Sequence, residues 1–261
     1  MLNIIVCIKQ VPDTNEVKLD PVTGTLIREG VPSIINPDDK AGLEAALFLK
    51  DEHGAKVTVI SMGPQQADLA LREALAMGAD EAILVTDRAF GGADTWATSS
   101  TLASAIRKLE YDLIITGRQA IDGDTAQVGP QIAEHLGLVN ISYAEEIKID
   151  GDSVIVRRQF EDRYHMLKAK MPCLITALSE MNKPRYMTPG GIFDAYLDKK
   201  VTIWTLLDLD VDQDNIGLKG SPTRVHKSFT KAAKGKGTIV TLDTQESVDF
   251  LVEKLQEKFI L

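Results

Sequence analysis

Alternation of strand-like and helix-like segments in the first half of the chain constrains the fold most. The strand-like segments are short, continuous apolar runs at residues 3–8, 56–61, 82–86 and 112–116. Such runs are typical of strands buried on both faces of a parallel sheet. Segments of helical composition lie between them, at residues 38–53, 65–77 and 95–109. The alternation indicates βαβ units, and so predicts an α/β fold in which helices flank both faces of a parallel sheet.

The pattern changes in the second half of the chain. Residues 145–160 are typical of an antiparallel hairpin, with its turn predicted at Asp150-Gly151. Residues 164–170 extend it by a third antiparallel strand, and residues 172–177 return to a buried strand. Residues 182–193 are rich in proline and glycine, and are therefore predicted to form a loop.

A C-terminal arm is expected beyond this region. The helix predicted at residues 244–259 follows a polar, lysine-bearing stretch, and its apolar residues share one face: Val248, Leu251, Val252, Leu255 and Phe259. That face packs either on another chain or back on the protein's own sheet, and the sequence leaves both open. We expect an α/β domain at residues 1–225, with the antiparallel hairpin as an insertion, and an arm at residues 226–261.

Composition excludes several classes of function. A formal charge of −9 disfavours nucleic-acid binding, which needs a basic face. No apolar run approaches the roughly 20 residues that span a bilayer, and the N-terminal residues lack the basic region of a signal peptide, so a cytoplasmic protein is expected. Cys7 and Cys173 lie far apart, and the histidines are scattered: His53, His135, His165 and His226. We therefore expect no disulfide, no metal site and no catalytic acid–base triad.

One loop is unusually polar for a connection between a buried strand and a helix. It begins with TGRQAIDGDTAQ, from Thr116 to Gln127. Asp124 and Gln127 have the spacing of a helix capping box, which does not account for Arg118, Gln119 and Asp122. In open α/β sheets, ligands bind beyond the carboxyl ends of the strands, where helix N-termini offer amides to anions. Neither GxGxxG after the first strand nor GxxxxGK[ST] occurs, so a nucleotide site of an unusual type is expected, in neither a Rossmann dehydrogenase nor a P-loop NTPase.

The same loop, GRQAIDGDTAQVGPQIAEHLG, resembles the nucleotide-binding segment of electron-transfer flavoprotein β subunits. Further segments resemble that family in the same order: VCIKQVPDT, INPDDKAGLEAAL, SMGP, ALAMGAD, VRRQFEDRYHMLKAKMPCLITA and NKPRYMTP. The resemblance covers nearly the whole chain. It implies a parallel α/β sheet of adenine-nucleotide-binding type, with flavodoxin-like or Rossmann-like strand order, and a C-terminal arm that embraces an α subunit in a heterodimer.

The resemblance also implies a set of nucleotide-binding residues at the ends of the predicted strands. The amides of residues 125–128 are expected to meet the diphosphate, and Cys7 and Met62 to line an apolar floor. The full set is Cys7, Asn36, Pro37, Asp38, Asp39, Met62, Asp94, Thr95, Thr98, Ser99, Gly117, Arg118, Gln119, Ala120, Ile121, Asp122, Gly123, Asp124, Thr125, Ala126, Gln127 and Val128. Considered without the resemblance, Cys7 and Met62 would be core residues, and Asp94 or Thr95 a helix cap.

The resemblance to this family does not by itself decide which of two nucleotides the β subunit binds. Simpler members hold a structural AMP in the β subunit, whereas electron-bifurcating members hold FAD there and oxidise NADH. The segment ADTWATS, with Thr95 and Thr98 three residues apart, resembles the bifurcating form and favours FAD. That form implies electron transfer to ferredoxin or flavodoxin and, through the α-subunit FAD, to a flavin dehydrogenase for acyl-CoA or a 2-hydroxy acid. The alternatives are a non-bifurcating shuttle with AMP, and a stand-alone adenine-nucleotide-binding regulatory protein.

Two further segments are implied to contact partners. The family docks its partner dehydrogenase through the loop that matches Tyr186, Met187, Thr188, Pro189, Gly190, Gly191, Ile192 and Phe193. Pro189 stands where many non-bifurcating members have leucine, which puts the acyl-CoA dehydrogenase of simpler systems in doubt. The lysines of the linker are expected to join the arm that grips the α subunit: Lys227, Lys231, Lys234 and Lys236. Without the resemblance, the first segment would be a surface turn and the second a solvated linker.

Overall fold

A computed structural model describes residues 1–13, 32–224, 235 and 237–261 of the chain. The chain divides into two units, Met1–His226 and Lys227–Leu261. Within the described residues, no helix has the length and apolarity that a membrane span requires.

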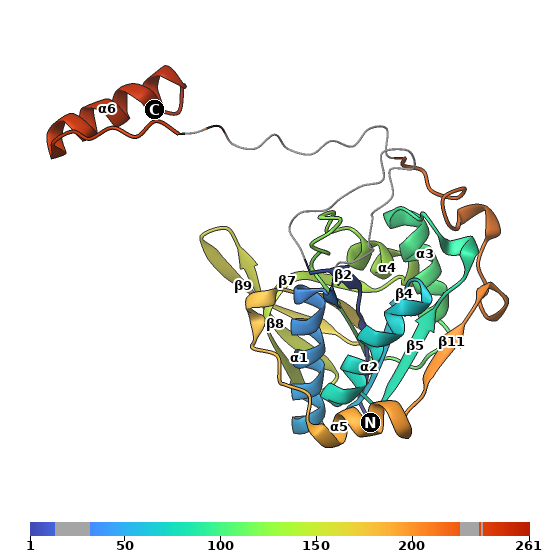
Figure 1. Ribbon diagram of the computed structural model, residues 1–261. Coiled ribbons are helices and arrows are strands. Elements are labelled where there is room, and N and C mark those ends of the chain that lie inside the picture. Colours follow the sequence, from blue (N-terminus) through green and yellow to red (C-terminus); the bar gives the residue numbers. More distant parts are fainter. Residues whose placement is uncertain (14–31, 225–234, 236) are drawn as a thin grey trace. The chain divides into compact units, whose positions relative to one another are not determined.

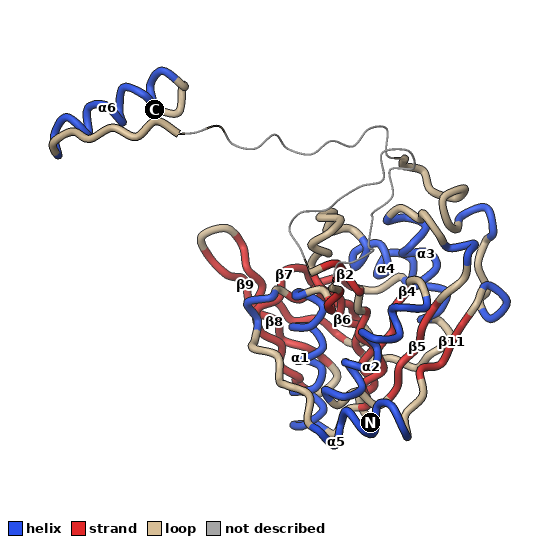
Figure 2. The backbone as a smooth tube through the Cα atoms, in the orientation of Figure 1, coloured by secondary structure: helices blue, strands red, loops and turns tan. Residues whose placement is uncertain are grey.

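The first unit is built on a nine-stranded sheet of order β11-β5-β4-β1-β6-β10-β7-β8-β9 (Figures 1 and 2). Seven neighbouring strands are parallel: β11 (Val201–Trp204), β5 (Glu81–Val85), β4 (Lys56–Met62), β1 (Asn3–Cys7), β6 (Leu113–Gly117), β10 (Cys173–Ala177) and β7 (Val139–Asp150). The last two, β8 (Ser153–Phe160) and β9 (Arg163–Lys170), pair antiparallel and form the predicted insertion. The order β5-β4-β1-β6 is the Rossmann arrangement, and the predicted α/β fold is confirmed.

Helices cover both faces of the sheet, as predicted. Helices α1 (Pro37–His53) and α2 (Asp68–Met77) lie on one face, and α3 (Thr95–Ile106) and α4 (Val128–Leu136) on the other (Figure 1). Alternate residues of β1 divide between the two cores. Ile4 and Val6 pack in the core cluster that contains Leu43 of α1 and Leu71 of α2. Ile5 and Cys7 pack in the cluster that contains Leu102 of α3 and Ile132 of α4, because successive strand residues point to opposite faces.

The prediction of a loop at residues 182–193 is wrong over its last residues. Helix α5 (Pro189–Leu197) begins there, and the Thr188 hydroxyl accepts a hydrogen bond from the Gly191 amide at 3.0 Å. Pro189 occupies the first helical turn, where its missing N–H has no cost. A threonine cap followed by proline is a helix-start signal that outweighs the turn character of the two glycines.

The hairpin turn lies one residue later than predicted. Asp150 pairs with Ser153, so the two turn residues are Gly151 and Asp152. Gly151 has a φ of 63°, which glycine adopts without steric cost. A small antiparallel ribbon, β2 (Gln10–Pro12) with β3 (Ser33–Ile35), was not predicted. Short 3-10 helices complete the unit: η1 (Gln65–Ala67), η2 (Arg88–Phe90), η3 (Ser179–Met181), η4 (Leu206–Asp208) and η5 (Gln213–Asn215).

The second unit contains helix α6 (Thr244–Glu257), two residues shorter than predicted. The Asp243 carboxylate caps it by accepting from the Glu246 amide at 2.9 Å. The helix buries none of its side chains, and Val248 and Leu251 on its apolar face are 49% and 59% exposed. His226 and the four linker lysines named above lie outside the described residues.

Candidate functional site

A cavity of about 1320 Å³ opens at the carboxyl edge of the parallel sheet. The ends of four neighbouring strands reach it through Cys7 of β1, Met62 of β4, Thr86 after β5, and Gly117 of β6. Strand order reverses between β1 and β6, because β1 leads through α1 to β4 on one side, whereas β6 pairs on the other. Ligands of open α/β sheets bind at such a point.

Most of the residues predicted to bind a nucleotide line this cavity. They are Cys7, Asp39, Met62, Asp94, Thr95, Thr98, Gly117, Arg118, Gln119, Ala120, Gly123, Thr125, Ala126, Gln127 and Val128. The others lie outside the lining that the described residues form: Asn36, Pro37, Asp38, Ser99, Ile121, Asp122 and Asp124. The structure thus brings the 117–128 segment and the 94–98 segment together around one space.

Asp39, in the first turn of α1, accepts hydrogen bonds from the backbone near the ends of β1 and β6. Its carboxylate accepts from the Lys9 amide at 2.8 Å and from the Gly117 amide at 2.9 Å. Burial raises the pKa of this carboxyl to about 7, against the lowering effect of the hydrogen bonds. Cys7 lies nearby, and burial, with the Asp39 charge second, raises the pKa of its thiol to about 12. At neutral pH Cys7 is therefore a neutral apolar surface and not a nucleophile.

Glycine is required at position 117, where the end of β6 packs against the start of α1. A Cβ built on it would overlap Asp39 Oδ1, and would lie 2.7 Å from the Asp39 nitrogen and 2.8 Å from Asp38 Cβ. The start of α1 therefore packs against the end of β6 at a distance that only glycine permits.

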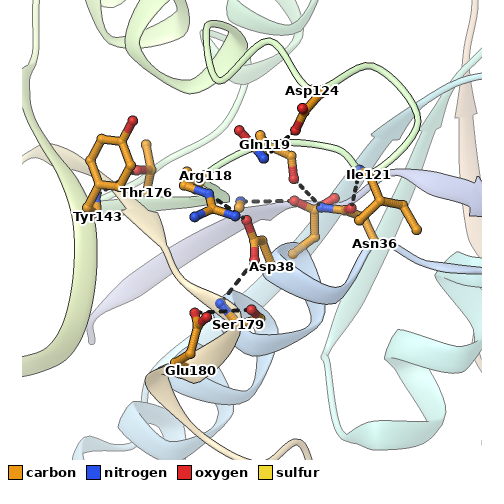
Figure 3. A network of polar contacts seen from close by, with 12 residues as sticks. Asn36, Asp38, Arg118, Gln119, Ile121, Asp124, Tyr143, Thr176, Ser179 and Glu180 are labelled. Atoms are coloured by element: carbon orange, nitrogen blue, oxygen red, sulfur yellow. Dashed lines mark hydrogen bonds and ion pairs between the residues drawn. The ribbon is translucent and has the colours of Figure 1, made fainter. Parts of the chain in front are cut away.

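Asn36 organises the loop that follows Gly117 instead of lining the cavity. Its side-chain nitrogen donates to the Gln119 carbonyl at 2.8 Å, and its side-chain oxygen accepts from the Ile121 amide at 3.0 Å (Figure 3). The residue is fully buried. These contacts satisfy the loop's backbone groups, which would otherwise lose water without replacement. A direct contact between Asn36 and a nucleotide stays a prediction.

Arg118 and Asp38 form a second brace under the same loop. Arg118 Nε lies 3.3 Å from Asp38 Oδ2, and the other Asp38 oxygen accepts from the Ser179 amide at 3.0 Å (Figure 3). Neither Arg118 Nε nor Asp38 Oδ2 has a hydrogen bond within the described part of the chain. Lys9 adds a partly buried ion pair of 2.6 Å with Asp122. Arg118 thus contacts the protein as well as bordering the cavity, whereas Asp122 contacts the protein outside the lining.

The predicted capping box of Asp124 and Gln127 is wrong. Helix α4 begins at Val128 with Gln127 as its cap residue, and the Gln127 side chain makes no hydrogen bond to the first amides of the helix. Asp124 has a φ of 52°, and its carboxylate instead accepts from the Gln119 side chain. The loop is therefore longer than the pattern indicated. The helix-terminal amides belong to Val128 and Gly129, both of which line the cavity.

Asp94 caps α3, as the sequence suggested. Its Oδ1 accepts from the Ala97 amide at 3.0 Å, and its Oδ2 from the Thr223 amide at 2.9 Å and hydroxyl at 2.7 Å. Burial alone would raise the pKa of Asp94, but these hydrogen bonds outweigh it and the pKa is lowered. Thr95 and Thr98 border the cavity, whereas Ser99 is fully buried and faces α4.

Several lining residues were not predicted. They follow β5 or come from the segment after β11: Thr86, Asp87, Arg88, Phe90, Gly91, Thr205 and Thr223. The first group could have been inferred, because it follows a predicted strand at the edge where ligands bind. The second group could not, since β11 lay in no predicted strand and its pairing with β5 joins segments far apart in sequence.

The segment implied to dock a dehydrogenase is separate from the cavity lining. Tyr186 is 86% exposed and Phe193 66%. Just before it, Arg185 forms a bidentate ion pair with Glu44 of α1 and a contact of 2.9 Å with Asp51. The Glu44 hydrogen bonds raise the pKa of Arg185 further, so its charge is permanent. The segment is therefore anchored at its start while its aromatic side chains face outward.

The fold and cavity define an α/β protein of Rossmann-type strand order with a ligand-sized space at the reversal point. A family model described as the electron transfer flavoprotein domain matches residues 23–199. The electron transfer flavoprotein subunit beta of Clostridium acetobutylicum is 61% identical over 98% of this chain and 99% of its own. The caffeyl-CoA reductase-Etf complex subunit CarD of Acetobacterium woodii is 57% identical, covering all of both chains. The acryloyl-CoA reductase electron transfer subunit gamma of Anaerotignum propionicum is 48% identical, also over all of both.

The chain therefore belongs to the electron transfer flavoprotein family, as one of its β subunits. The resemblance found in the sequence is confirmed.

Proposed function

We propose that the protein is the β subunit of an electron-bifurcating electron transfer flavoprotein, that it binds FAD in the cavity, and that NADH is the electron donor. When bound, FAD would supply the redox chemistry, and the chain would bind and orient it. The observation that carries the proposal is one cavity of about 1320 Å³ bordered by both the 117–128 segment and the 94–98 segment.

The size of the cavity supports FAD over AMP. Pockets for small ligands and cofactors hold roughly 300–1,000 Å³. AMP is one part of FAD, so a mononucleotide would leave much of a 1320 Å³ space to water. The lining beyond the 117–128 segment combines polar residues such as Thr95 and Thr98 with apolar ones such as Phe90 and Leu102, so it offers contacts both to a polar chain and to an aromatic ring.

The chemistry of the lining fits a dinucleotide. Val128 and Gly129 open helix α4, so their amides have no acceptor within the helix and are available to an anion. The positive end of the helix dipole strengthens this preference for a phosphate. Asp39 lines the same cavity, and its raised pKa reduces the negative charge of the lining near neutral pH. Cys7 and Met62 offer apolar surface for a ring.

Two partners are part of the proposal. We infer an α subunit that binds the C-terminal unit, because α6 presents an apolar face that the unit does not bury. The relatives include subunits named after caffeyl-CoA reductase and acryloyl-CoA reductase, which supports a flavin dehydrogenase as the second partner. Ferredoxin or flavodoxin would be the low-potential acceptor. The exposed aromatic residues Tyr186 and Phe193 are proposed to dock the dehydrogenase.

The test is to co-express the chain with its α subunit and to quantify the nucleotides released on denaturation. Two FAD per heterodimer without AMP, together with bleaching of flavin absorbance by NADH, is the expected result. One FAD with one AMP would contradict it and leave a simple electron shuttle, the second candidate. A stable homodimer without an α subunit would point to a nucleotide-binding regulatory protein instead.

Two variants on helix α3 test whether FAD binds in the cavity. Thr98→Val removes a hydroxyl that borders the cavity while keeping the shape of the side chain, and should lower the FAD content of the purified complex. Ser104→Ala is the control on the same helix, because its hydroxyl donates to the Asp210 carbonyl away from the cavity lining. Equal FAD loss in both variants would indicate a general loss of fold.

A further inference from the structure

A row of polar side chains lies between helices α3 and α4. It contains Thr95 and Ser99 from α3, with Gln131 and His135 from α4 and Gln127 at its cap. Thr95 and Gln127 border the cavity, whereas Ser99 is fully buried and His135 lies two helical turns beyond Gln127. The row therefore leads from the interior of the helix pair to the cavity wall.

Successive members of the row are within hydrogen-bond distance. His135 Nε2 lies 3.1 Å from Ser99 Oγ, which lies 3.3 Å from Gln131 Oε1. Gln131 Nε2 lies 3.5 Å from Thr95 Oγ1, a long contact, and Thr95 Oγ1 donates to Gln127 Oε1 at 2.9 Å.

Counting protons gives the row a direction. The Ser99 hydroxyl has one hydrogen, and it faces two oxygens that only accept, Gln131 Oε1 and the Trp96 carbonyl at 2.9 Å. We assign the hydrogen to Gln131 Oε1, which leaves His135, in its Nε2–H form, as the donor to Ser99. Thr95 likewise has one hydrogen, which it gives to Gln127 Oε1 while it accepts from Gln131. The chain of donors thus runs from His135 to Gln127.

This direction determines how the side-chain amide group of Gln127 is oriented. Its oxygen is engaged by Thr95, so its N–H₂ group is the end that remains for a ligand. We propose that Ser99, Gln131 and His135 are positioning residues, which through Thr95 hold Gln127 as a hydrogen-bond donor to the cavity. The group recognised there is an acceptor oxygen of the bound nucleotide, either of a phosphate or of the flavin ring. The inference rests on the proposed nucleotide-binding function and deepens it.

The surroundings of His135 are consistent with a fixed donor. The guanidinium of Arg107, the residue that follows α3, donates to the His135 carbonyl at 2.5 Å. Glu134 precedes His135 on α4, and the Trp96 ring centroid lies 4.8 Å from that of His135, in an edge-on arrangement. Burial, with Arg107 second, lowers the pKa of His135. The imidazole carries a hydrogen on Nε2 in the assigned neutral tautomer and in the cation alike. Nucleotide affinity should therefore not change as His135 titrates.

The experiment measures binding of FAD and of AMP to the nucleotide-depleted heterodimer. Ser99→Ala, which alters a residue outside the cavity lining, should weaken binding by about fivefold to tenfold, the effect of one hydrogen bond. Ser100→Ala is the matched control, since that hydroxyl makes no hydrogen bond within the described residues, and should bind as the unaltered protein does. Thr95→Ser, which restores the hydroxyl, should bind more tightly than Thr95→Val.

Gln127→Glu separates a donor from an acceptor at the cavity. The carboxylate still accepts from Thr95 but offers only oxygen to the ligand, so affinity should fall at least as far as in Gln127→Leu. Loss of both FAD and AMP affinity would place the acceptor on the phosphate, and loss of FAD affinity alone on the flavin. Unchanged affinity in Ser99→Ala, or tighter binding in Gln127→Glu, would overturn the inference. Failure of the unaltered heterodimer to bind either nucleotide would instead refute the proposed function.

Discussion

Gly117→Ala tests the junction between β6 and α1 most directly. The new methyl group would overlap Asp39 Oδ1 and come within 2.7 Å of the Asp39 backbone nitrogen, so a rotamer change alone does not relieve the clash. Overpacking of this kind costs about 1–3 kcal/mol. If the carboxylate moves aside, the amides of Lys9 and Gly117 lose their acceptor, at about 1–3 kcal/mol for each buried unpaired group.

Together these effects predict a loss of about 3–9 kcal/mol in the free energy of unfolding, with the lower end applying if the carboxylate keeps its contacts to the two amides. That is a large share of the roughly 5–15 kcal/mol of a typical domain. Urea unfolding followed by far-UV circular dichroism measures it, with a lower midpoint and an unchanged slope expected. Gly123→Ala is the control in the same loop, because a Cβ there meets nothing within 4 Å, and it should stay within about 0.5 kcal/mol. Equal midpoints for the two variants would refute the steric argument.

Three further outcomes are expected. Burial raises the pKa of Asp39 from 3.8 to about 7, so the folded state binds one more proton than the unfolded state between these pH values, and the free energy of unfolding should fall by roughly 2–3 kcal/mol from pH 5 to pH 8. Urea titrations of Asp39→Asn at both pH values should lack this difference. Asn36→Ala leaves the Gln119 carbonyl and the Ile121 amide unpaired, so hydrogen exchange in residues 118–124 should accelerate by at least tenfold, and unchanged exchange would contradict the bracing role. Gly191→Ala places a methyl group against the Ala76 carbonyl and should lower the thermal midpoint by several degrees, about 2–4 °C per kcal/mol, whereas Gly190→Ala has open space and should not.

The sequence allowed the fold to be predicted where local pattern decides it. The first four parallel strands are buried on both faces, so their apolar runs are continuous and unmistakable. Strand β11 (Val201–Trp204) was missed because it is an edge strand with only partial burial, and its position depends on pairing with β5. Helix α5 was missed because Pro189 and the two glycines after it read as a turn, although the Thr188 cap permits a helix.

The candidate site could be predicted only in part, for a similar reason. The 117–128 segment follows a strand and was found by its polarity and its resemblance. Asn36 and Ser99 were grouped with the lining, but their side chains turn into the protein, to the loop backbone and to α4 respectively. Which way a polar side chain faces depends on its tertiary partners, and spacing along the chain does not contain that information. Thr223 was missed because its contact with Asp94 spans 129 residues.

The carboxylate of Asp39 has a consequence for folding. It accepts from the amide of Lys9, two residues after β1, and from the last amide of β6, that of Gly117, and the latter contact spans 78 residues of sequence. The cavity floor therefore cannot assemble until both halves of the parallel sheet have docked, since neither half alone provides both donors. Hydrogen bonds between residues so far apart in sequence form late and slowly in folding, and they break only when the rest of the core unfolds. We expect the amides of Lys9 and Gly117 to exchange with solvent deuterium only through global unfolding, so that the binding floor persists for as long as the fold itself.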